Sequence, residues 1–77
     1  MTTHTTAKSL RAAAEHLQRA LTSLGDARQH ELDDAGDCDL DTSVGHEGHI
    51  LHMATSYYVA GIEAKTREAL NAIEAVA

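Results

Sequence analysis

Between residues 31 and 41 the chain reads ELDDAGDCDLD, and this stretch separates two segments of helical character. It holds six acids and no base, whereas the other six acids of the chain are matched by all six Lys and Arg. The net charge of −6 is therefore local. Gly and Asp disfavour regular structure and are typical of connections. We predict an all-α fold, a two-helix antiparallel hairpin whose acidic connection spans residues 33–43.

The segment before the connection has helical spacing and no proline. At 100° per residue, one stripe of a helical wheel collects apolar side chains. These are Leu10, Ala13, Leu17, Ala20, Leu21 and Leu24. We predict a helix over residues 6–32, with a possible break at Gly25, after a frayed N-terminus at residues 1–5.

The segment after the connection predicts a second helix over residues 44–76, with Ser43 as its N-terminal cap. Its apolar stripe is expected to face the first helix. The stripe consists of Val44, Leu51, Tyr58, Ile62, Ala69, Ile73 and Val76, and is widened by Ala54 and Leu70. The helix-favouring composition of residues 63–77 supports helix close to the C-terminus.

A chain of 77 residues forms a single domain, here residues 1–77, with a thin core. One cysteine, Cys38, excludes an intrachain disulfide, and the six histidines do not form the paired units of a zinc-stapled fold. Two hairpins packed together would bury more apolar surface than one. We therefore predict a homodimer in the form of a four-helix bundle.

The acidic balance argues against direct nucleic-acid binding, since phosphate contacts need a basic patch. No apolar run reaches the roughly 18–20 residues that span a bilayer, and no secretory signal is visible, so we expect no membrane association and a cytoplasmic protein. No catalytic triad, phosphate-binding loop or placed carboxylate pair is present, and we expect no enzyme activity.

Asp37, Asp39 and Asp41 have the alternating spacing with which calcium loops present oxygen ligands, and they partly resemble an EF-hand loop. The loop's sixth position requires Gly and is Thr42 here, and its twelfth requires Glu and is Gly48. The competing interpretation is a solvated acidic connection without a ligand.

His46, His49 and Met53 share one face of the second helix. Imidazole and thioether ligands together favour copper, so this face is a candidate metal site. The alternative is a set of solvent-exposed polar side chains with no bound cofactor.

Tyr57 lies beside the predicted core stripe, near Ala54, Gly61 and Ala64, on a flat strip of small residues. Such a strip suits protein docking, because Tyr contributes area at low entropic cost. The alternative is that the strip forms the second face of the dimer core. We predict a small acidic protein–protein interaction module, an adaptor, regulator or inhibitor of a larger protein partner. Asp37, Asp39, Asp41 and Tyr57 would make the contact, and the alternative function is metal-ion binding.

Overall fold

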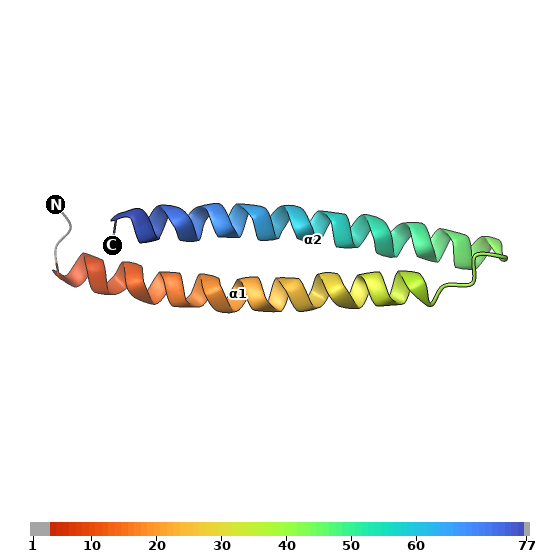
Figure 1. The fold of residues 1–77 in the computed structure, drawn as a ribbon, viewed down its shortest axis with the longest axis horizontal. Coiled ribbons are helices and arrows are strands. Elements are labelled where there is room, and N and C mark those ends of the chain that lie inside the picture. The colour runs from red at the N-terminus through yellow and green to blue at the C-terminus, as the bar shows by residue number, and fades with distance from the viewer. Residues whose placement is uncertain (1–3, 77) are drawn as a thin grey trace.

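The structure, a computed structural model, describes residues 4–76 as two long antiparallel helices lying side by side (Figure 1). Helix α1 spans His4–Gly36 and helix α2 spans Ser43–Val76, with no strand among the described residues. The Cα atoms extend over 60 × 14 × 11 Å, so the molecule is a rod two helices wide. The prediction of an all-α hairpin is confirmed.

Helix α1 is longer than the sequence predicts. It runs through Gly25 without interruption and ends at Gly36 rather than at Leu32. Glycine costs a helix interior only about 1 kcal/mol, and no glycine of residues 4–76 has a positive φ, so Gly25 does not terminate the helix. The predicted frayed segment 1–5 lies partly outside the described residues, and His4 and Thr5 already belong to α1.

The face of α1 that contacts α2 follows alternating steps of three and four residues, the spacing of a coiled-coil seam. Its members are half-buried, or buried in the case of the last: Leu10, Ala14, Leu17, Leu21, Leu24, Arg28, Glu31 and Ala35. The predicted apolar stripe of this helix is therefore confirmed as the inward face.

The inward face of α2 differs from the prediction. It also steps by three and four residues, through Gly45, His49, His52, Ser56, Val59, Glu63, Thr66, Leu70 and Ile73. Of the predicted stripe only Leu70 and Ile73 are turned inward, and the other members are exposed: Val44, Leu51, Ala54, Tyr58, Ile62, Ala69 and Val76. The helical wheel identified the most apolar face of α2. However, α2 packs on α1 through the face that carries small and polar side chains.

Two pairs of polar side chains join the helices across this seam. Arg28 Nε donates to Glu63 Oε1 at 2.6 Å, and His52 Nδ1 lies 2.5 Å from Glu31 Oε2. These pairs allow polar residues to occupy inward positions without unpaired polar atoms, and no buried side-chain N or O of the described residues lacks a partner.

The hairpin has little core. Among residues 4–76 only Ala35, Ser56 and Leu70 are buried, and no side chain is completely enclosed. A rod only two helices wide leaves one side of each helix in solvent, which accounts for this thin interior. Over the described residues, neither helix holds a stretch long and apolar enough to cross a bilayer.

The connection is six residues long, 37–42, because the first acids of the predicted connection belong to α1. Thr42, not Ser43, caps α2, since Thr42 Oγ1 accepts a hydrogen bond from Gly45 N at 2.9 Å. Asp39 Oδ1 accepts from Asp41 N at 3.0 Å, which folds the connection back on itself. A Cβ on Gly45 would lie 1.6 Å from the carbonyl oxygen of Asp39, so only glycine fits this crossing point.

Candidate interaction surface

The side of α2 turned away from α1 presents a continuous apolar surface, which we call the outer strip. It consists of Ile50, Leu51, Ala54, Tyr57, Tyr58, Gly61 and Ile62, all of them exposed. Tyr57 is 84% and Tyr58 73% exposed, values unusual for side chains with this much apolar area. The predicted position of Tyr57 beside Ala54 and Gly61 is in agreement with this surface.

The outer strip is also free of charge. The fifteen residues 48–62 include no Asp, Glu, Lys or Arg. The spacing of the strip repeats the three-and-four pattern of the inward seam, so α2 carries two parallel packing faces. Only one of them is covered by α1.

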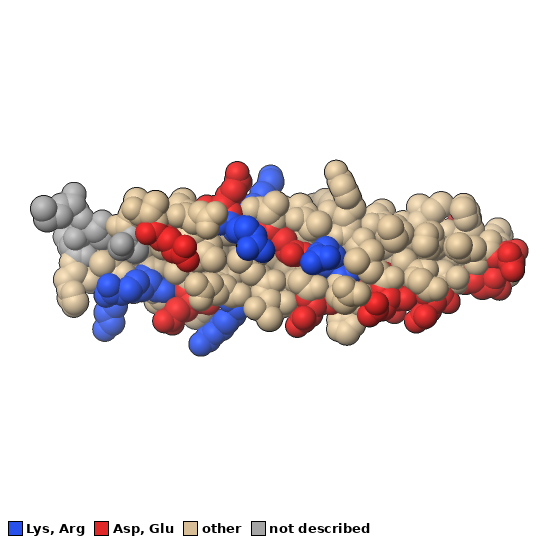
Figure 2. All heavy atoms as spheres, in the orientation of Figure 1, with Lys and Arg blue, Asp and Glu red and all other residues tan. Residues whose placement is uncertain are grey.

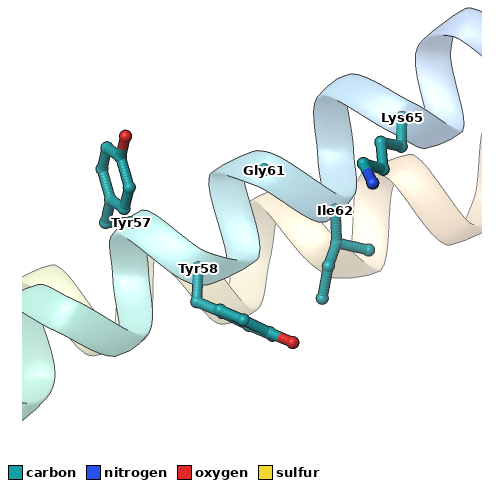
Figure 3. A pocket seen from close by; sticks show the side chains of 5 residues that line it. All are labelled: Tyr57, Tyr58, Gly61, Ile62 and Lys65. Atoms are coloured by element: carbon teal, nitrogen blue, oxygen red, sulfur yellow. The ribbon is translucent and has the colours of Figure 1, made fainter.

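A shallow hollow of about 250 Å³ lies in this strip. It is lined by Tyr57, Tyr58, Gly61, Ile62 and Lys65, all on α2 (Figure 3). The side chains of Tyr57 and Tyr58 point in different directions from α2 (Figure 3). Gly61 lies one turn further on and has no side chain to fill the space between its neighbours. A Cβ placed on Gly61 would meet no atom within 4 Å.

Charge is distributed unevenly along the rod. Carboxylates gather toward the end with the connection, whereas Lys and Arg lie along the other part of the molecule (Figure 2). Residues 28–52 hold one base and seven acids, and the remaining residues hold five of each, so this third of the chain at the connection end carries the entire charge of −6.

The three aspartates of the candidate calcium loop are exposed at the end of the rod. Asp37 N donates to the carbonyl oxygens of Asp33 and Asp34, which completes the last turn of α1. The Asp39 carboxylate accepts a hydrogen bond from Asp41 N within the connection. These contacts give the aspartates a role in ending α1 and shaping the turn.

The three residues of the candidate metal face have different surroundings. His46 and Met53 are exposed, whereas His49 is half-buried and turned toward α1. His49 Nδ1 donates to the carbonyl oxygen of Ala35 at 2.8 Å, and so satisfies a carbonyl in the last turn of α1. Across residues 4–76, no three His, Cys, Asp or Glu side chains lie close enough together to hold a metal ion.

Three features of α2 were missed from the sequence. Tyr58 is exposed and does not belong to the hairpin core, a hollow lies at Gly61, and His52 on the inward face contacts Glu31. The three-and-four spacing that places residues 45, 49, 52 and 56 on one face is visible in the sequence. Because these residues are small or polar, hydrophobic periodicity did not identify their face as the inward one.

No protein-family model matches this chain, and searches among curated proteins and among solved structures likewise found no match.

Proposed function

We propose that this chain is a small acidic protein–protein interaction module that works as a homodimer. The outer strip of α2 binds the same strip of a second copy. Because this strip faces away from α1, the two α2 helices form the centre of a four-helix assembly and the α1 helices lie on its outside, in place of the closed four-helix bundle expected from the sequence. The acidic connections at the ends of the assembly then meet a larger protein partner. The observation that carries the proposal is the uncharged apolar strip of α2, which α1 leaves uncovered.

The accessible surface supports a second copy as the occupant. The isolated chain exposes 5679 Å². A compact protein of 8.2 kDa exposes about 4,500 Å² according to the usual scaling with mass. The surplus exceeds the roughly 800 Å² that each partner hides in an interface of standard size. One dimer contact of standard size along α2 would therefore remove most of this surplus.

The chemistry of the strip supports the same occupant. Two apolar surfaces leave water together at a gain of about 25 cal/mol per Å², and no charge in residues 48–62 has to be desolvated. Tyr57 and Tyr58 belong to a residue type that is enriched at the centres of interfaces. The exposed face of α1, in contrast, is rich in charged and polar side chains and suits contact with water.

The acidic end of the hairpin supports contact with a basic partner surface. Asp37, Asp39 and Asp41 are exposed there, within the segment 28–52 that carries the whole net charge. Clustered charge of one sign accelerates encounter with an oppositely charged surface and excludes partners of like charge. In this proposal the acidic end selects the partner, whereas the outer strip mediates self-association.

Sedimentation equilibrium tests the homodimer. The wild-type chain is expected to have twice the monomer mass of 8.2 kDa at micromolar concentration. Leu51→Glu introduces a charge into the outer strip and should give monomers. Ala12→Glu places the same charge on the exposed face of α1 and should leave the dimer intact. A wild-type chain that stays monomeric at 100 µM contradicts the proposal.

Affinity capture from the native cell tests the partner contact. A protein retained by the wild-type chain should be lost with the triple variant Asp37→Asn, Asp39→Asn, Asp41→Asn. The matched control neutralises three acids of the other half, Glu15→Gln, Glu68→Gln and Glu74→Gln, and should retain it. Equal retention by both triple variants would assign the acidic connection to solubility alone.

A further inference from the structure

The hollow in the outer strip has the form of a packing hole of a coiled coil. In knobs-into-holes packing, a side chain of one helix enters a diamond of four residues on the other, at positions i, i+3, i+4 and i+7. Tyr58, Gly61, Ile62 and Lys65 have this spacing and line the hollow together with Tyr57. The glycine leaves the floor of the diamond open, with no atom within 4 Å of the position of a Cβ.

The side chain that suits this hole stands next to it. Tyr57 is 84% exposed and points away from the helix at the edge of the hollow (Figure 3). The volume of about 250 Å³ exceeds that of an engineered apolar cavity of about 150 Å³ known to admit a benzene ring. The ε-ammonium of Lys65 at the rim is also a favourable neighbour for the face of an aromatic ring.

We propose, on the basis of the homodimer proposed above, that Tyr57 of each chain inserts into the Tyr58–Gly61–Ile62–Lys65 hole of the second copy. The contact is reciprocal about a two-fold axis, with Tyr57 of one chain opposite Gly61 of the other. Two antiparallel α2 helices in this register are centred on residue 59. That position is the middle of Ser43–Val76, so the two helices overlap over their whole length.

The same register places compatible residues on either side of the axis. Ala54 lies opposite Ala64 of the second copy, and these small side chains permit a close approach of the helices. Ile50 lies opposite Glu68, beyond the fully apolar centre. The interface is therefore apolar at its centre and polar toward its ends, which is the usual arrangement.

The charge of the rod determines the antiparallel direction. In a parallel pair, the two connection ends (residues 28–52), each with a charge of −6, would lie side by side, within the screening length of about 10 Å at 0.1 M salt. In the antiparallel pair each connection end lies beside the opposite end of the second copy, which belongs to the part of the chain whose charges balance. The two acidic ends are then separated by about the length of the rod, 60 Å.

Cysteine cross-linking tests direction and register together, in a Cys38→Ser background so that no other thiol is present. Ile50→Cys and Glu68→Cys chains, with tags of different size, are mixed and treated with a short thiol-specific cross-linker. The antiparallel register predicts a mixed Ile50→Cys/Glu68→Cys product. Each variant alone should remain uncoupled, because residue 50 lies about 27 Å along the helix from its own copy. Self-coupling of Ile50→Cys, or no mixed product from a dimeric sample, overturns the arrangement.

Filling the hole provides a second test. Gly61→Leu should raise the dimer dissociation constant at least tenfold, although leucine is the better helix former and the hairpin itself should not be weakened. Tyr57→Ala should have a similar effect, and Tyr57→Phe should retain tight association. Ala12→Leu, which adds three of the same four carbon atoms on the exposed face of α1, is the control and should leave the dissociation constant unchanged.

The outcomes separate this inference from the proposal on which it rests. A monomeric wild-type chain defeats both. A dimer whose dissociation constant is unaffected by Gly61→Leu and Tyr57→Ala defeats only the knob-and-hole contact. A dimer that both changes weaken, with the mixed cross-link present, supports the antiparallel arrangement.

Discussion

Gly45 lies where the connection crosses the first turn of α2, and the crossing is closer than any side chain permits. A Cβ there would be 1.6 Å from the Asp39 carbonyl oxygen and 2.9 Å from Thr42 Oγ1. Both atoms take part in forming the turn, because Asp39 O accepts from Thr42 Oγ1, and Thr42 Oγ1 caps the helix. A change at residue 45 therefore affects the connection and the cap together.

We expect Gly45→Ala to destabilise the protein by about 1–3 kcal/mol, the range usual for forced overpacking. Gly25→Ala is the matched control, because a Cβ at Gly25 meets nothing within 4 Å. The control should gain up to about 1 kcal/mol from helix propensity. Urea denaturation followed by circular dichroism, at one protein concentration, measures both. Equal effects of the two changes would contradict the close crossing at Gly45.

The N-terminal cap of α2 provides a second test at the level of single residues. Thr42→Ala removes the oxygen that accepts from Gly45 N and should cost about 1 kcal/mol. Ser43→Ala, the matched change at the cap expected from the sequence, should cost less than about 0.5 kcal/mol. The same denaturation experiment distinguishes them, and a larger loss at Ser43 would restore the original assignment.

At this scale the sequence indicated residue types better than residue roles. It predicted a hydroxyl cap at the start of α2, but Ser43 and Thr42 are adjacent and both can serve, so only the geometry selects Thr42. Tyr57 was correctly placed beside Ala54 and Gly61. The bond from His49 to the Ala35 carbonyl depends on how closely the helices approach, which composition does not specify.

Among the elements, α2 is the more informative, because it has two faces that can pack against another helix. Its inward face holds His52, Ser56 and Glu63, and its outer face holds Leu51, Tyr58 and Ile62. Hydrophobic periodicity identifies an apolar face but does not say which neighbour covers it. The sequence therefore predicted both helices and the inward face of α1, whereas its assignment for α2 was wrong.

The Arg28–Glu63 pair tests whether the polar seam holds the helices together. A double-mutant cycle with Arg28→Ala and Glu63→Ala should give a coupling of about 1 kcal/mol, above that of a typical exposed pair, because the Glu63 carboxylate is only 15% exposed. The comparison cycle uses Glu15 and Arg19, which are exposed and four residues apart on α1, and should give about 0.3–0.5 kcal/mol. If the coupling energy of Arg28–Glu63 does not exceed that of Glu15–Arg19, the contact between Arg28 and Glu63 adds nothing to stability beyond an exposed pair.

For the whole molecule, the dominant features are its length and the concentration of charge at one end. Both were partly evident from the sequence, since the local charge and the hairpin follow from composition and helical periodicity. The extent of exposed surface was not evident, because it depends on which face of α2 is covered. The antiparallel dimer that we propose combines the two features, because it holds the acidic ends far apart.

Neutralising the acidic end should therefore leave self-association unchanged. The triple variant Asp37→Asn, Asp39→Asn, Asp41→Asn is expected to change the dimer dissociation constant by less than about twofold at 0.1 M salt, because the two ends are many screening lengths apart. Sedimentation equilibrium at low and high salt measures this. A dimer strengthened markedly by the triple change would indicate that the acidic ends lie side by side.

The alternating steps of three and four residues along both inward faces also make the hairpin modular in length. Seven residues added to α1, and seven at the matching level of α2, restore the same inward positions one repeat further on. Each such addition lengthens the rod by about 10 Å, since a helix rises 1.5 Å per residue. In the proposed dimer, the distance between the two acidic ends is thus set by the number of seven-residue repeats in the hairpin.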